Sequence, residues 1–213
     1  MATGGWDTVA GTGGTLRHLR AADYRTMPWK NGLGETVEIG RAARPGAGDY
    51  DFDWRISVAP VVADGAFSRF EGIDRTIMVI EGAGMELSLA GRAASPRRLM
   101  PFQPLAYDGG LAIEGRLLAG PVRDFNVMTR RDLWRSVLAV EEGSSRIAAS
   151  GGGAGTVIVA YALSGSWRIA ADSHPALTLA AGESIHGTGL SGLAVAPDGG
   201  AGRLALALLV PFA

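Results

Sequence analysis

The sequence contains no cysteine. Disulfide bonds, thiolate metal sites and cysteine nucleophiles are therefore excluded. Histidine is also scarce, because His18, His174 and His186 are the three in the chain and lie in separate segments without a His-X-His pair. Since protein metal sites need clustered His, Asp or Glu ligands, we expect no metal ion and no cofactor.

Long apolar runs and an excess of one charge are missing as well. No run approaches the roughly 18 apolar residues of a membrane-spanning helix. The first 14 residues are polar and rich in glycine, unlike a signal peptide. The formal net charge is -1 without a basic block, so neither nucleic acid nor an anionic membrane surface would be attracted. We expect a cytoplasmic protein whose partner is a small molecule, and a homodimer is left open.

The sequence that is present favours β-structure. It has 32 glycines in 213 residues, and short alternating or apolar runs recur about every 8–12 residues with turn signals between them. Clear examples are residues 53–59, 75–80 and 122–129. No long amphipathic helix is evident. This pattern predicts an all-β sandwich or barrel.

A weak internal repeat suggests two halves. Residues 76–80, a Gly82-Ala83-Gly84 turn and residues 85–87 parallel residues 157–161, a Ser164-Gly165 turn and residues 167–169. We interpret both turns as hairpins, although chance similarity between hairpins is an alternative. The expected organisation is a disordered leader over 1–14, a first barrel half with a ligand pocket over 15–131 and a second half over 132–213.

The stretch from Met27 to Thr36 is the most unusual local sequence. Trp29 gives a turn an apolar anchor, while Gly32 and Gly34 permit positive φ and close backbone approach. Lys30 and Asn31 would then be held in a fixed place. The alternative is an ordinary hairpin turn whose lysine is solvated.

Polar side chains also alternate along predicted strands. The pairs are Thr36 with Glu38, Arg55 with Ser57, and Asp124 with Asn126. Solvent-facing positions of an antiparallel sheet would give the same pattern. However, Ser, Asp and Asn are poor strand formers, which suggests another purpose.

Two arginines in this pattern lie close to predicted core residues. Arg55 is flanked by Trp54 and Ile56, and Arg75 leads a strongly apolar strand. An arginine held by packing can clamp a carboxylate in a planar, bidentate manner. Lys30, Arg55 and Arg75 would therefore receive a small acid, with Asn31 and Asn126 hydrogen-bonding its neutral parts. The alternative for Asp124 is a structural ion pair with one of the arginines.

Several of these motifs together resemble the HutD/Ves family. They occur in the family's order and span roughly residues 16–131: Met27-Pro28-Trp29-Lys30-Asn31-Gly32, Phe52-Asp53-Trp54-Arg55-Ile56-Ser57, Phe67-Ser68-Arg69-Phe70, Gly72-Ile73-Asp74-Arg75-Thr76, Glu81-Gly82-Ala83-Gly84 and residues 120–128. The sequence departs from the family pattern at Leu33, where the family usually has a glycine.

The resemblance implies a fold and a class of ligand. It implies a bicupin, in which two β-barrel or jelly-roll-like halves share one chain, and a protein without the histidine-bound metal of many cupins. Family members are often encoded with histidine-utilisation genes and are thought to be regulatory or ligand-binding. The ligand class implied is a small acidic intermediate of that pathway.

Our first hypothesis is a metal-free binding protein for a small carboxylate such as an N-acylated amino acid. Trp29 would shape the turn, Lys30 and Arg55 would neutralise the acid, and the side chains that orient it would be Asn31, Ser57 and Asn126, with Arg75 as a further member. A second hypothesis is a metal-independent isomerase or hydrolase that uses Glu38 or Asp124 as the base and Lys30 as its electrostatic partner. A third is a structural module without a ligand.

Overall fold

The fold is built almost entirely from β-strands. A computed structural model describes residues 14–29, 34–89, 96–148, 155–171 and 174–212. Within them the chain forms strands β1 to β19 and one short 3-10 helix, Ala21–Asp23. The predicted all-β class is confirmed. No helix in these ranges has the length and apolar character needed to cross a membrane. The predicted leader, apart from Gly14, lies outside the described residues.

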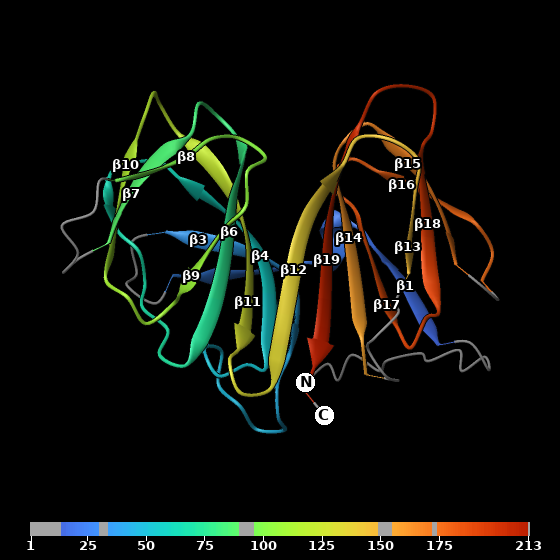
Figure 1. Ribbon diagram of the computed structural model, residues 1–213, viewed down its shortest axis with the longest axis horizontal. Helices are drawn as coiled ribbons and strands as arrows, with labels where there is room; N and C mark the ends of the chain where they lie inside the picture. The colour runs from blue at the N-terminus through green and yellow to red at the C-terminus, as the bar shows by residue number, and fades with distance from the viewer. Residues whose placement is uncertain (1–13, 30–33, 90–95, 149–154, 172–173, 213) are drawn as a thin grey trace. The chain divides into compact units, whose positions relative to one another are not determined.

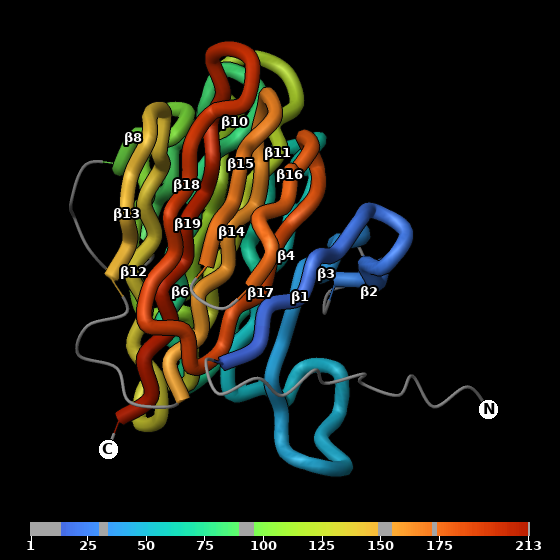
Figure 2. The backbone as a smooth tube through the Cα atoms, turned by 90° about the vertical axis from the view of Figure 1, so that its right-hand side faces the viewer, coloured from blue at the N-terminus to red at the C-terminus, as the bar shows by residue number. Residues whose placement is uncertain are grey.

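The chain divides into two compact units. The N-terminal unit comprises residues 22–139 with the last residues from Pro211 onward, and the C-terminal unit comprises residues 140–210 with the chain before Ala22. Strand β1 (Thr15–Leu19) belongs to the C-terminal unit because it pairs along its length with β17 (Ser184–Thr188), as Figure 2 shows. This differs from the expected boundary, which kept residue 15 onward in the first half. Local sequence gives no information about this distant pairing.

The N-terminal unit contains two sheets around an apolar core. A six-stranded sheet has the order β2-β3-β4-β11-β6-β9, and a four-stranded sheet has the order β5-β10-β7-β8 (Figure 1). The core between them takes Ile77 and Val79 from the first sheet and Met85 and Leu87 from the second. The strand bounds are β2 Arg25–Pro28, β3 Glu35–Ala42, β4 Trp54–Val61, β5 Gly65–Ala66, β6 Ile73–Glu81, β7 Met85–Leu89, β8 Arg97–Leu99, β9 Leu105–Asp108, β10 Ile113–Leu117 and β11 Val122–Arg130.

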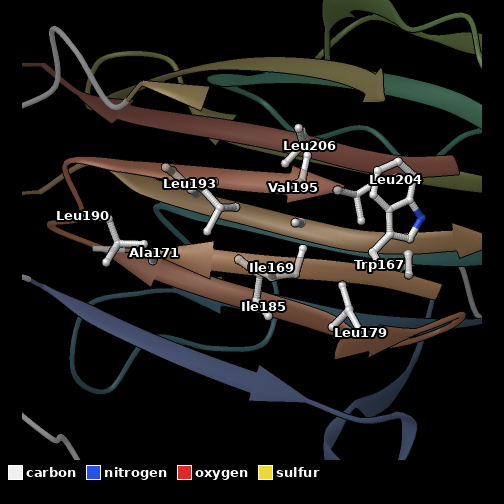
Figure 3. Packing of buried hydrophobic residues seen from close by; sticks show 13 residues of the cluster. Trp167, Ile169, Ala171, Leu179, Ile185, Leu190, Leu193, Val195, Leu204 and Leu206 are labelled. Carbon is white, nitrogen blue, oxygen red and sulfur yellow. The ribbon is translucent and has the colours of Figure 1, made fainter. Parts of the chain in front are cut away.

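The C-terminal unit has a closely packed interior. One sheet contains the run β1-β17-β14-β19 and the other has the order β13-β18-β15-β16. An apolar cluster draws side chains from both sheets, and Trp167, Ile169 and Leu204 in it are fully buried (Figure 3). The bounds are β13 Ser145–Ala148, β14 Val157–Ser164, β15 Ser166–Ala171, β16 Leu177–Ala180, β18 Gly192–Pro197 and β19 Arg203–Pro211, while β12, Trp134–Glu141, spans the boundary between the units.

Two central strands of the N-terminal unit are buried on both faces. In β4 the first six residues are all buried, and in β11 the run from Asp124 to Thr129 is buried. Because side chains alternate across a strand, one face of β4 carries Trp54, Ile56 and Val58, while the other carries Arg55 and Ser57. The interpretation of the polar positions as solvent-facing is therefore wrong, since the sheet is covered on this side too.

The register of these strands brings the two arginines together. Met128 of β11 lies opposite Arg55 of β4 on one side and opposite Arg75 of β6 on the other. Asn126 is likewise paired with Ser57. Neighbouring strands lie about 4.8 Å apart, so residues from three strands that are distant in sequence form one polar patch.

The two glycine turns interpreted as hairpins are instead corners between sheets. After the turn that contains Gly82, β7 pairs with β8 and β10 and does not continue the sheet of β6. The Gly165 turn similarly carries the chain from the sheet of β14 to the sheet of β15. A short Gly-containing turn suits either geometry, so sequence alone did not distinguish them.

The glycine at the first corner should be the costly one to replace. Gly82 has φ +95°, and a Cβ there would lie 2.5 Å from the Pro121 carbonyl oxygen, whereas Gly46 has φ +79° in open space. We expect Gly46→Ala to cost about 1 kcal/mol of unfolding free energy and Gly82→Ala about 3 kcal/mol or more. Urea denaturation followed by circular dichroism measures both. Equal losses would show that the close approach at Gly82 is relieved without cost.

Candidate functional site

A cavity of about 160 Å³ opens in the N-terminal unit. The polar side of the wall comes from the six-stranded sheet, and the apolar side comes mainly from the segment after β4. The lining residues are Pro28, Trp29, Thr36, Tyr50, Arg55, Ser57, Ala59, Val61, Val62, Ala63, Asp64, Gly65, Ala66, Phe67, Ser68, Phe70, Arg75, Asp124, Asn126 and Met128.

A chain of hydrogen bonds runs along the polar wall. Arg75 donates from Nε and Nη2 to Oδ1 of Asn126, over 2.9 and 2.6 Å. Asn126 in turn donates from Nδ2 to Oδ1 of Asp124 over 2.8 Å. All three side chains are at least nine-tenths buried. Both ends of the amide are therefore used, which fixes its orientation.

The guanidinium group of Arg75 is also held by aromatic rings. Its Cζ lies 5.0 Å from the centre of the Phe67 ring and 5.7 Å from that of Tyr107. These are cation–π distances. No carboxylate of a described residue forms an ion pair with Arg75, and its Nη1 makes no hydrogen bond to a described residue. A fixed cation with an unused donor thus faces the cavity.

Arg55 has a carboxylate partner behind the cavity wall. Its Nε lies 3.2 Å from Oε2 of Glu38, and both side chains are buried. This is an ion-pair distance, but the N–H is not aimed at the oxygen, so neither atom gains a hydrogen bond among the described residues. Burial lowers the pKa of Arg55 and raises the pKa of Glu38, in each case against the attraction of the other charge. Such a pair is costly to bury.

Among the titratable groups that line the cavity, Asp124 has the largest pKa shift. Burial raises the pKa of its carboxyl from 3.8 to about 6, against the opposing effects of the Arg75 charge and the Asn126 hydrogen bond. Perturbed acids at a concave site are typical of functional centres. The cavity therefore combines two buried guanidinium groups, an oriented amide and an acid that titrates near neutral pH.

Two aromatic residues of the cavity lining, Trp29 and Tyr50, are held by backbone contacts. Tyr50 donates from its hydroxyl to the Pro28 carbonyl oxygen over 3.1 Å, and the Trp29 amide donates to the Gly34 carbonyl oxygen over 2.7 Å. A Cβ on Gly34 would lie 3.0 Å from the Trp29 ring, so a side chain there would require the ring to shift. The role of Trp29 in shaping the turn remains a prediction.

The structure brings together most of the residues that the sequence predicted for the site. Trp29, Arg55, Ser57, Arg75 and Asn126 all line the cavity, and so does Asp124. Glu38 lies behind Arg55 and is not part of the lining. Lys30, Asn31 and Leu33 fall outside the described residues. The ligand-binding roles of the predicted site residues and the acid–base roles of Glu38 and Asp124 remain predictions.

Sequence reasoning missed the groups that hold Arg75. Phe67 and Tyr107 come from a loop and from the edge strand β9, and isolated aromatics in such segments give no sign of a guanidinium between them. The Phe67-Ser68-Arg69-Phe70 motif was the one available signal, since it placed Phe67 among the residues that define the resemblance.

Comparison with known proteins identifies the family. The HutD family model matches residues 21–204. The chain belongs to the HutD family. It is 38% identical over 175 residues to an uncharacterised 21.2 kDa protein in the hutC 3′ region of Pseudomonas putida, covering 82% of this chain and 83% of that one. It is also 36% identical over 151 residues to protein Ves of Citrobacter koseri, covering 69% and 74%.

Solved structures agree with this assignment. HutD from Pseudomonas fluorescens SBW25 (formate condition) has a TM-score of 0.75 at 33% identity, covering 93% of this chain and all of that one. Oxalate decarboxylase of Bacillus subtilis matches at 10% identity with a TM-score of 0.60, which concerns the fold alone. This HutD-family protein therefore has a cupin-like all-β fold.

The cavity residues do not suit a metal ion. A pirin of the same fold, from Escherichia coli, was solved in complex with nickel(II). In this HutD-family protein, the two guanidinium groups at the cavity would repel a cation, and the Asp124 carboxylate is engaged by Asn126. No cluster of three or more His, Asp or Glu among the described residues has a ligating arrangement.

The ionised form of Asp124 should destabilise the folded protein. The pKa of this carboxyl is higher in the folded than in the unfolded chain. The protonated carboxyl therefore adds to the free energy of unfolding below about pH 4, and this contribution is lost as pH rises through about 6. The rise in pKa from 3.8 to about 6 corresponds to roughly 3 kcal/mol of unfolding free energy. Asp124→Asn should therefore be more stable than the wild type at pH 7.5 by about 1–3 kcal/mol, with a smaller difference at pH 4.5.

Urea denaturation at the two pH values measures this difference. Comparing variant with wild type at each pH cancels the effects of other groups, including the half-buried His186, whose lowered pKa acts in the opposite direction. A difference that is the same at both pH values would contradict a costly ionised Asp124.

Proposed function

We propose that this protein binds a small carboxylate in the cavity of the N-terminal unit. The observation that carries the proposal is the Arg75 guanidinium, which is buried, oriented by Asn126 and without an ion-pair partner among the described residues. A bound carboxylate would supply the missing negative charge and accept from Nη1. Arg55 would add a second positive charge, because Glu38 neutralises it only through a poorly aligned contact.

The dimensions and walls of the cavity restrict the acid. A cavity of about 160 Å³ is close to the roughly 150 Å³ that encloses a benzene molecule in another protein. Phe67, Val61 and Val62 supply apolar lining beside the polar groups, and the Phe67 ring lies against Arg75. The expected ligand is a compact acid whose carboxylate meets the guanidinium groups, with Ser57 and Asn126 able to hydrogen-bond a neutral amide.

We further propose that the acid is an N-acylated amino acid of the histidine-utilisation pathway, which has the required carboxylate and amide, and that the protein has a regulatory role. Support comes from the family and from the relative named for the hutC 3′ region. We further infer a bicupin, in which the C-terminal unit is a second barrel that contributes stability, since its interior is filled by apolar side chains. We assign carboxylate binding to the N-terminal unit, because its cavity is lined by Arg55 and Arg75.

A thermal-shift screen tests carboxylate binding. At 100 times its Kd, an acid that binds only the folded state adds about 2.7 kcal/mol, which should raise Tm by roughly 5 °C or more. Arg75→Gln should lower the affinity for that acid by at least about tenfold, because it removes a charge-assisted hydrogen bond. The panel contains acetate, N-acetylglycine, N-acetylglutamate and acids of the histidine pathway.

Arg123→Gln is the matched control for this screen. Arg123 lies on β11, as Asn126 does, but is paired on the surface with Glu81 outside the cavity. Its substitution should leave every acid-induced shift unchanged. If no acid stabilises the wild type, or if both arginine variants respond alike, the cavity is not a carboxylate site.

A metal-independent isomerase or hydrolase is the second candidate. The observation in its favour is Asp124, a cavity-lining acid whose pKa of about 6 suits a general base near neutral pH. Incubating the same acids with the protein and following them by NMR tests it. Turnover that disappears in Asp124→Asn supports catalysis, and unchanged spectra for every acid count against it.

A further inference from the structure

The carboxylate of Asp124 is placed to respond to whatever occupies the cavity. Its side chain is 1% exposed and lines the same wall as Arg75. It makes no ion pair with a described residue, and Oδ1 accepts from Nδ2 of Asn126 over 2.8 Å. Asp124 is therefore a buried negative charge whose cationic partner is reached only through an amide.

The Asn126 amide links this acid to the cation that faces the cavity. Its oxygen accepts two bonds from Arg75, and its nitrogen donates to Asp124. The positive charge of Arg75 consequently favours the ionised form of Asp124 from a distance. An anion that bound Arg75 directly would compete with Asp124 for the same positive charge.

We propose that Asp124 takes up a proton when an anion enters the cavity, so that ligand binding and proton uptake are coupled at this site. The inference rests on the proposed carboxylate binding and adds a property to it. The proton comes from solvent and goes to the Asp124 carboxylate, and no other bond is formed or broken.

Two physical effects act in the same direction when an anion binds. Its charge repels the ionised Asp124 and offsets the favourable field of Arg75, and its body displaces water from the cavity. Because burial already holds the pKa of Asp124 at about 6 without a ligand, a further rise moves its titration into the neutral range. Affinity for the anion should then fall as pH increases from about 6 toward the pKa of the complex.

Other titratable or charged groups line the cavity or contact its arginines. Glu38 is the main rival as a proton acceptor, because burial also raises its pKa, but it is paired with Arg55. Tyr107 has a pKa raised by burial and stays neutral through this range. The groups to consider are Arg75 on β6, Arg55 on β4, Glu38 on β3, Tyr107 on β9 and Asp64 before β5, whose Oδ1 accepts from the Leu117 amide.

Calorimetry of the full chain with N-acetylglycine and with acetate tests the coupling. Titrations at pH 7 in Bis-Tris and in Tris, cationic buffers with different ionisation enthalpies, give the number of protons taken up per bound acid. We expect a value above zero and up to one. The Kd should rise between pH 7 and pH 8 by up to about tenfold, which is the limit for one proton.

Two variants assign the proton to a residue. Asp124→Asn should abolish both proton uptake and the pH dependence, and should bind the acids more tightly than the wild type at pH 8. Glu38→Gln should keep the proton uptake, whatever it does to affinity. If Asp124→Asn does not fold, the wild-type proton count together with Glu38→Gln still decides the question.

The outcomes distinguish failure of the proton coupling from failure of the proposed carboxylate binding on which it rests. Acids that bind without proton uptake, or uptake that survives Asp124→Asn or disappears in Glu38→Gln, overturn the coupling and leave carboxylate binding intact. Absence of binding by either acid at both pH values overturns the coupling together with the proposed binding function.

Discussion

The site depends on the burial of charged and amide groups inside a β-sandwich. A guanidinium group loses its hydration there, and hydrogen bonds and ring contacts must compensate for the lost hydration free energy. Arg75 receives both, from Asn126 and from the rings of Phe67 and Tyr107. Arg55 receives less, since its contact with Glu38 is poorly aligned. The unmet requirement of the two arginines is the physical basis of the proposed anion binding.

The two units use similar layers for different purposes. Each has two sheets around a core, and in each a glycine turn passes the chain from one sheet to the other. In the C-terminal unit the inward positions are apolar and Trp167 fills the interior. In the N-terminal unit the inward positions change along β4 from Val61 to Ser57 and Arg55. An apolar core and a polar-lined cavity thus arise from the same alternation of side chains, with different residues placed inward.

Much of the fold and part of the site could be predicted from local sequence. Period-two alternation located β4 and β11, an apolar run located β6, and poor strand formers at Asp124 and Asn126 indicated a purpose other than strand formation. The short strand β8 carries Arg97 and Arg98, so its sequence resembles that of a polar loop. The glycine turns were assigned the wrong connection, because a turn specifies a reversal or corner and not which strand lies beside the next one.

By itself, the sequence determined the all-β class, the family and the alternation that puts Arg55, Ser57 and Asn126 on common strand faces. Only the tertiary structure decided that this face is covered, that Met128 lies between the two arginines, and that Asn126 joins Arg75 to Asp124. It also decided that β1 pairs with β17. Alternation is a local property of the backbone, whereas register and burial depend on which distant strands pair.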